Sequence, residues 1–249
     1  MNRRSLIANY ATYYEGDWNL IAKAIKDNEP PHLVEVQKNY ITIFDDLYPK
    51  QFLNLRFPPW CIFYEGNLSL LEKPAVTIVG SRNVSPYGVY VTKNCALALC
   101  KEHVLISGLA RGVDGLVHET AIQYGIGTIG VIGCGLDILY PIANQRIRTI
   151  MNESHLALSE YPNGTKPLAH HFPWRNRMLA ALGDAVVVTQ ATLRSGTMCT
   201  VNEAIELSKE IYVAPWPLND INGMGCNKLI EQGAFIIASL QDLQQMLAG

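Results

Sequence analysis

The chain has 249 residues, of which 49% are hydrophobic and 17% charged, a composition that supports a sizeable buried core and excludes a wholly disordered protein. Its formal net charge of −2 argues neither for nor against a nucleic-acid partner. No segment approaches the roughly 18 consecutive apolar residues of a membrane span, so membrane insertion is not expected.

Charge is unevenly distributed along the chain. Residues 1–72 carry 7 basic and 9 acidic side chains, residues 73–200 carry 11 and 7, and residues 201–249 carry 2 and 6. The middle segment is therefore basic between two acidic flanks. Because a bound anion responds mainly to charges within about 10 Å, the middle segment is the place to expect an anionic ligand.

Residues 1–40 are expected to form a short helical region. Leu6, Ile7 and Tyr10 recur at helical spacing, and a second helical run follows. Glu15 and Asp17 interrupt the N-terminus before any long apolar region, so it does not read as a signal peptide. Residues 41–72, rich in proline and aromatic side chains, are expected to form a short connector that contains strands.

From residue 74 to residue 239 the pattern changes to short apolar runs separated by stretches long enough for a helix. Nearly continuous apolar strands that alternate with helices indicate a parallel sheet covered on both faces. The prediction is one doubly wound α/β domain. The runs are AVTIVG (75–80), HVLISG (103–108), GTIGVIG (127–133), HLALSE (155–160), AVVVTQ (185–190), IYVAP (211–215) and AFIIAS (234–239).

The six cysteines form no CxxC pair and no Cys/His cluster at zinc spacing. Several lie among apolar neighbours, which is typical of reduced core thiols in a cytoplasmic protein. Neither disulfides nor a metal site are expected.

Small or polar residues follow most of the predicted strands, for example the Gly80-Ser81-Arg82 turn and the Gly133-Cys134-Gly135 turn. In doubly wound sheets, ligands bind outside the carboxyl ends of the strands, near the point where the strand order reverses. Small residues there let backbone N–H groups approach an anion. One such turn is most simply a tight turn, but their succession favours a phosphate-binding rim.

The segment KPLAHHFPWRNRM interleaves basic and aromatic residues and contains no acid. Cation and aromatic side chains together hold a nucleic-acid backbone while stacking an unpaired base. Equally, Phe172 and Trp174 could belong to the core, with the arginines on a solvated face. Spacing alone leaves both interpretations open.

No hydrolytic or redox site assembles from the sequence. The serines lack a GxSxG elbow, and Asp114 with His118 has no partner nucleophile. The glycines at 130, 133 and 135 give GxxGxG rather than GxGxxG, so a dinucleotide cofactor is not expected. The sequence predicts no cofactor.

Seven motifs resemble, in order and spacing, the DNA processing protein A family (DprA, also called Smf), and the resemblance covers residues 41–238. It implies an extended Rossmann-like fold with a mostly parallel sheet, here after a short helical N-terminal extension. It also implies a cytoplasmic homodimer that binds single-stranded DNA and loads RecA onto it in natural transformation, without catalysis. The motifs are GSRNVSPYG, SGLARGVDGLVHETAI, GTIGVIGCGLDILYPIANQRI, LSEYP, FPWRNRMLAALGDAVVV, LRSGTMCTVNEAI and GCNKLIEQGA.

Carried over by position, the resemblance implies a DNA-binding set. Lys166 is included as the substitute for a basic residue that some members carry where this chain has Ala169. The set is Ser81, Arg82, Arg111, Gly133, Gly135, Lys166, Phe172, Arg175, Asn176, Arg177, Ser195, Gly196 and Thr197. Residues 41–249 are expected to form this DNA-binding domain.

The segment SGTMCTVNE faintly resembles the PGGxGTxxE motif of nucleotide monophosphate phosphoribohydrolases, with Glu203 as the acid. The alternative function is therefore a nucleotide-binding enzyme related to these hydrolases. The apolar residues Leu229, Ile230, Leu240, Leu243 and Met246 near the C-terminus are candidates for a dimer surface.

Overall fold

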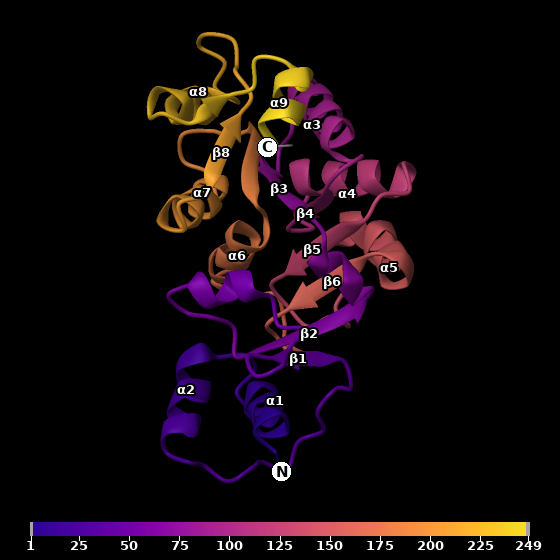
Figure 1. Cartoon of the computed structure of the whole chain (residues 1–249), viewed down its shortest axis with the longest axis vertical. Helices are drawn as coiled ribbons and strands as arrows, with labels where there is room; N and C mark the ends of the chain where they lie inside the picture. Colours follow the sequence, from indigo (N-terminus) through magenta and orange to yellow (C-terminus); the bar gives the residue numbers. More distant parts are fainter. Residues whose placement is uncertain (1, 248–249) are drawn as a thin grey trace.

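A computed structural model describes residues 2–247, apart from the side chains of Asn152, Glu153 and Met246. Across the described residues, nine strands form one sheet in the order β1-β2-β6-β5-β4-β3-β7-β8-β9 (Figure 1). The strands are β1 (Tyr40–Thr42), β2 (Cys61–Gly66), β3 (Ala75–Gly80), β4 (Val104–Ser107), β5 (Thr128–Ile132), β6 (Leu156–Ser159), β7 (Ala185–Gln190), β8 (Glu210–Val213) and β9 (Phe235–Ile236).

Helices connect most of the parallel strands, and short 3-10 turns lie in the connecting segments. The helices are α1 (Arg3–Tyr13), α2 (Trp18–Lys26), α3 (Pro86–Leu99), α4 (Val113–Gln123), α5 (Gln145–Ser154), α6 (His171–Leu182), α7 (Thr197–Glu206), α8 (Met224–Glu231) and α9 (Leu240–Leu247). The 3-10 turns are η1 (Lys50–Asn54), η2 (Leu68–Glu72) and η3 (Ile142–Asn144).

The strands from β3 to β9 all pair in parallel, so the prediction of a mostly parallel α/β sheet is confirmed. β3 and β7 coincide with the predicted apolar runs. The connector contributes more than expected, because β2 pairs antiparallel with β6, and β1 pairs antiparallel with β2. Residues 40–66 therefore extend the sheet by two strands.

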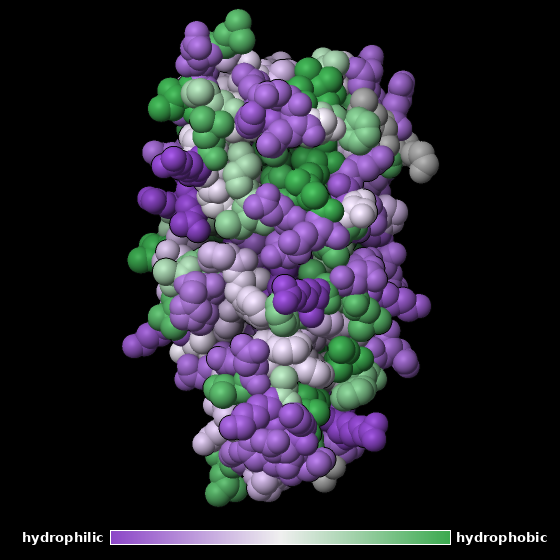
Figure 2. Space-filling view, turned by 90° about the vertical axis from the view of Figure 1, so that its left-hand side faces the viewer, coloured by the Kyte–Doolittle hydropathy of each residue, from purple (hydrophilic) through white to green (hydrophobic). Residues whose placement is uncertain are grey.

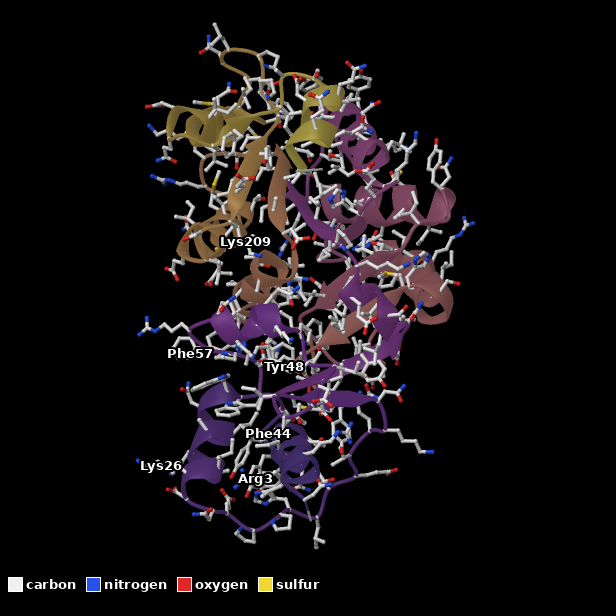
Figure 3. All side chains as sticks on the ribbon, viewed as in Figure 1. Arg3, Lys26, Phe44, Tyr48, Phe57 and Lys209 are labelled. Carbon is white, nitrogen blue, oxygen red and sulfur yellow. The ribbon has the colours of Figure 1, made fainter. Side chains whose placement is uncertain are left out.

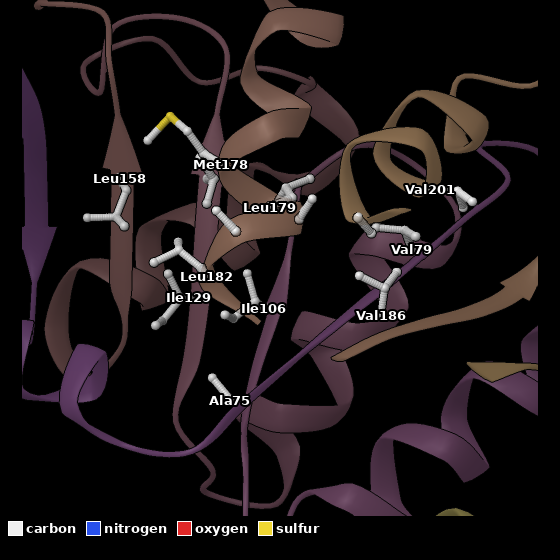
Figure 4. Close-up of a cluster of buried hydrophobic side chains, with 14 of the residues drawn as sticks. Ala75, Val79, Ile106, Ile129, Leu158, Met178, Leu179, Leu182, Val186 and Val201 are labelled. Atoms are coloured by element: carbon white, nitrogen blue, oxygen red, sulfur yellow. The ribbon is translucent and has the colours of Figure 1, made fainter. Parts of the chain in front are cut away.

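Two hydrophobic clusters cover the two faces of the parallel sheet. On one face α3, α4 and α9 pack against β3, β4 and β7. On the other, α6, α7 and α8 pack around buried side chains such as Val79, Ile106 and Leu179 (Figure 4). Burial on both faces explains why the central strands are apolar without alternation.

The N-terminal helices share a third cluster with the sheet. Tyr10 of α1 and Ile21 of α2 are buried together with Phe63 of β2. Figure 3 labels Phe57 above α2, and the Phe57 ring contacts both Trp18 of α2 and Trp174 of α6. The N-terminal helices are thus packed onto the sheet, and a domain boundary at residue 40 stays a prediction.

The order of the strands reverses at β3. From β3 the chain adds β4, β5 and β6 in turn on one side, and α6 then returns it to place β7 on the other side of β3. The connections leaving β3 and β7 therefore diverge at their carboxyl ends. This divergence opens the crevice in which doubly wound folds bind ligands.

Candidate nucleic-acid interface

A groove of about 430 Å³ lies at the carboxyl ends of β3 and β7, where the strand order reverses. A smaller hollow of about 60 Å³ adjoins it, and Arg82, Ala110 and Phe172 line both. We call the two together the binding groove. Its other lining residues are Val79, Gly80, Ser81, Asn83, Gly108, Arg111, Asp114, Ile132, Gly133, Cys134, Tyr140, Pro141, Pro173, Arg175, Asn176, Leu179, Thr192, Ser195, Gly196, Thr197, Cys199 and Thr200.

The turn that follows β3 is held by the side chain of Gln190. Its Nε2 donates to the Asn83 carbonyl at 3.0 Å, and its Oε1 accepts from the Ser85 backbone N–H at 3.0 Å. The Ser81 hydroxyl closes the turn by accepting from the Asn83 N–H at 3.1 Å. The Gln190 amide supplies a donor and an acceptor together, and the resulting turn leaves Arg82 exposed.

Gly112 allows the start of α4 to approach this turn. Its φ is +76°, and a side chain there would bring a Cβ within 2.3 Å of the Ser81 carbonyl oxygen. The Val113 N–H donates to the same oxygen at 3.1 Å. The first turn of α4 is thus joined to the turn after β3, with Arg111 exposed beside it.

Three side chains form a cation–aromatic layer on the groove wall. The Arg82 guanidinium carbon lies 5.6 Å from the centre of the Phe172 ring. On that ring packs Tyr140, with centroids 5.6 Å apart and planes tilted by 36°. Tyr140 is 46% exposed and is absent from the set predicted from the sequence. Tyr140 lies directly before Pro141 in the motif GTIGVIGCGLDILYPIANQRI, and membership of this motif was the signal in the sequence that could have identified it.

Arg175 lies beneath the groove rather than on its surface, being 4% exposed. Its Nη1 donates to the carbonyl of Gly108 at 2.7 Å and also to the carbonyl of Val131. Burial lowers the pKa of Arg175 to about 10, with the nearby Asp114 acting in the opposite direction. The guanidinium remains charged at neutral pH, so a buried cation underlies the groove.

Arg177 is not among the residues that line the groove. Its Nη2 donates to both carboxylate oxygens of Glu160, at 2.7 and 2.8 Å, with both side chains 4% exposed. Its Nε donates to the Phe57 carbonyl at 3.0 Å, and its guanidinium covers the Trp174 ring. Successive helical residues are about 100° apart, so α6 presents Phe172, Arg175 and Asn176 to the groove and Trp174 and Arg177 away from it.

The start of α7 forms the opposite wall of the groove. Its N-cap, Gly196, has no side-chain cap, and the Met198 and Cys199 N–H groups donate to the Ser195 and Gly196 carbonyls, so the Thr197 N–H is the one in the first turn left without a partner among the described residues. The buried Ser195 hydroxyl oxygen has no hydrogen-bond partner among the described residues. An anion near a helix N-terminus gains from both features.

Gly133 lines the smaller hollow, whereas Gly135 and Lys166 line neither part of the groove. The Gly135 N–H donates to the Thr165 carbonyl at 2.9 Å, and a Cβ there would lie 2.7 Å from the Pro162 carbonyl oxygen. Gly135 therefore permits a close approach of two backbone segments. Lys166 is exposed on the loop between β6 and α6.

Nowhere in residues 2–247 do three or more His, Cys, Asp or Glu side chains gather as metal ligands would. None of the described helices is long and apolar enough to cross a membrane.

The chain matches known proteins over most of its length. Residues 39–248 match the family model of DNA recombination-mediator protein A. DNA processing protein DprA of Streptococcus pneumoniae is 42% identical over 202 residues, covering 81% of this chain and 72% of that protein. The protein of the same name from Bacillus subtilis is 37% identical, covering 84% and 71%. Protein Smf of Escherichia coli is 36% identical, covering 81% and 54%.

Solved structures agree with these matches. The X-ray structure of DNA processing protein A from S. pneumoniae superposes with a TM-score of 0.81 at 37% identity, covering 94% of this chain and 79% of that one. DNA processing protein A from Helicobacter pylori, described for its single-stranded DNA binding mode, gives a TM-score of 0.77 at 35% identity, covering 84% and 95%. By sequence and by fold, the chain belongs to the DNA recombination-mediator protein A family, known as DprA or Smf.

Proposed function

We propose that the binding groove holds single-stranded DNA. The observation that carries the proposal is the layer of Arg82, Phe172 and Tyr140, which places an exposed cation against the half-buried Phe172 ring and the exposed Tyr140 ring at the carboxyl edge of the sheet. Arg82 and Arg111 would contact phosphates, and an unpaired base would stack on Phe172 or Tyr140. The start of α7, with Ser195, Gly196 and Thr197, would bind a further phosphate.

This division of labour explains a preference for single strands. Duplex DNA has the higher charge density and would prevail in a purely electrostatic contest. Only an unpaired base offers its face to the Phe172 and Tyr140 rings. We therefore assign strand selectivity to the aromatic rings and most of the affinity for phosphates to the arginines.

Arg175 and Arg177 take supporting roles in this proposal. Arg175 fixes the ends of β4 and β5 and adds positive charge below the groove, while Arg177 joins α6 to Glu160 and to the segment before β2. Lys166 and Gly135 lie outside the groove, and direct contact is proposed for neither. A longer strand could still meet Lys166 on its exposed loop.

Transfer of the strand to RecA within the cytoplasm is the biological role that we propose. Membership of a recombination-mediator family supports the transfer of DNA to RecA. The six cysteines are free thiols, which supports the cytoplasmic location. The acidic residues after position 200, such as Glu206, are poor partners for DNA and better suited to a protein contact.

A homodimer through the C-terminal elements is also proposed. Leu229 and Leu243 are buried within the single chain, so they contribute no free surface, and the Met246 side chain lies outside the described residues. Phe235 and Ile236 of β9 and Leu240 of α9 remain 37% to 47% exposed. Figure 2 shows apolar side chains gathered in the upper half of the face that carries α7 and α8, whereas its lower end is mostly hydrophilic.

The alternative of a nucleotide hydrolase finds less support. Glu203, the candidate acid, is not among the residues that line the groove. Burial raises the pKa of its carboxyl, as does Glu206, while Arg177, on the side of α6 away from the groove, lowers it. Glu203 therefore lies outside the binding groove, in which we propose that nucleic acid binds.

Titration with three ligands tests the function. We expect tight binding of a single-stranded oligonucleotide, weaker binding of the matching duplex and negligible binding of mononucleotides, with no base released on chromatography. Stronger binding of the duplex, or release of a base, would contradict the proposal. A pull-down of RecA with and without oligonucleotide tests the transfer role separately.

A further inference from the structure

Two exposed tyrosines lie on consecutive turns of α3, outside the binding groove. Tyr87 is 41% exposed and Tyr90 is 64% exposed. Their rings are stacked, with centroids 6.5 Å apart and planes within 23° of each other. Two adjacent aromatic side chains turned to solvent form a contiguous exposed patch, and such patches mark interaction sites more often than single exposed residues do.

Tyr87 is fixed at the carboxyl edge of the sheet. Its hydroxyl donates to the Pro215 carbonyl at 3.2 Å, and its ring meets the buried Trp216 edge-on at 4.9 Å. Tyr90 follows three residues later, about 4.5 Å further along the helix axis. Lys93, also exposed, continues the same row. The row thus presents two aromatic faces and then a cation.

The surroundings of this row suit an anionic polymer. Between Lys73 and Lys101 the chain carries four basic residues and no acidic one. The helix also starts next to the groove, because Ser85, its N-cap, is tied by Gln190 to the turn that carries Arg82 and Asn83. A strand that leaves the groove past Asn83 therefore meets the first turn of α3.

We infer that Tyr87 and Tyr90 form a second stacking platform, which binds the bases of a single strand where it leaves the groove. This inference rests on the proposed function and extends its site. The groove fixes the strand, and the α3 row lengthens the segment that the protein covers. The physical basis is that stacking on an aromatic ring accepts any base, so such a row adds affinity without adding sequence preference.

Oligonucleotide length separates the platform from the groove. For a strand of about 16 nucleotides, Tyr90→Ala is expected to lower affinity about tenfold, whereas for one of about 4 nucleotides, which fills only the groove, it has no effect. Tyr90→Phe keeps the ring and should bind both lengths like the unmodified protein. Tyr124→Ala is the matched control, because Tyr124 is 55% exposed at the far end of α4.

Abasic nucleotides distinguish stacking from charge. Replacing the bases at one end of the long strand with abasic sites keeps every phosphate. The unmodified protein should then lose about as much affinity as Tyr90→Ala loses with the intact strand, and Tyr90→Ala should lose no more. Testing each end in turn shows which end lies on α3.

Each outcome has a definite meaning. Equal affinity of Tyr90→Ala and the unmodified protein for the long strand overturns the inference and leaves the face to a protein partner. An equal loss on both lengths also overturns it, because it places Tyr90 at the groove. If neither length binds to the unmodified protein, the proposed function fails instead.

Discussion

The guanidinium of Arg177 and the carboxylate of Glu160 form a buried pair that joins α6 to the end of β6, with two contacts of 2.7 and 2.8 Å. A charge in this position is stable only while its partner is present, because neither group reaches water. The pair therefore governs the stability of the fold beside the groove rather than its affinity for phosphates.

Arg177→Ala is accordingly expected to destabilise the protein by about 3–5 kcal/mol, the usual cost of leaving one buried charge unpaired. Urea denaturation followed by circular dichroism measures the loss. In conditions where the variant is folded, the slope of log affinity against log salt should match that of the unmodified protein. A normal stability with a flatter salt slope would instead place Arg177 on the DNA.

Arg82→Ala should show the opposite pattern. Arg82 is exposed, so its removal changes stability by less than about 0.5 kcal/mol. Loss of one phosphate contact should reduce the salt slope for single strands by about 0.7. Lys101→Ala is the matched control, because Lys101 is exposed beyond the other end of α3. Identical salt slopes for both variants would remove Arg82 from the site.

Phe172→Ala tests strand selectivity. Stacking of one base contributes about 1–3 kcal/mol, so the variant should lose roughly tenfold to a hundredfold in affinity for single strands and little for duplex. Tyr140→Ala should show a loss of the same kind, and the double variant less than the sum of both, because the rings contact each other. Equal losses on both strand types, with a lowered melting temperature, would make Phe172 a core residue.

The sequence predicted the parallel sheet well because β3 and β7 are mostly apolar and end in small or polar residues. The sequence predicted strands in the connector, but periodicity could not reveal that they join the sheet by antiparallel pairing. β2 lies in a segment rich in proline and aromatic residues, and its pairing with β6 joins residues about ninety positions apart. Such pairing depends on tertiary contacts, which local patterns do not encode.

The site shows the same division between local and tertiary information. The turn with Ser81 and Arg82 was predictable because it follows an apolar strand. Deciding which residues of the segment FPWRNR face the groove required the orientation of α6. This orientation places Arg175 beneath the groove and Arg177 against Glu160. Tyr140 enters through its contact with Phe172, 32 positions later in the chain, so composition near Phe172 could not reveal it.

We expect His118 to make the folded protein less stable as the pH falls. The side chain is fully buried on α4, and its Nδ1 lies 2.8 Å from the Thr128 hydroxyl oxygen. That hydroxyl donates to the Leu105 carbonyl at 2.6 Å, so it must accept from His118, which fixes the neutral tautomer with the proton on Nδ1. Nε2 is buried without a hydrogen-bond partner among the described residues, so a second proton gains little there beyond the effect of the nearby Ser107 backbone.

Burial, followed by the nearby His155, lowers the pKa of His118 to about 3 in the folded protein. The unfolded chain binds a proton near pH 6.5, so it gains protons before the folded state does. The stability that neutral His118 contributes is therefore complete above about pH 6.5 and declines as the pH falls towards 3, by up to about 1.4 kcal/mol per pH unit. Urea denaturation at several pH values measures this slope, and His118→Gln should reduce it. An unchanged slope in that variant would assign the acid sensitivity to other groups, first among them His155, whose pKa burial also lowers.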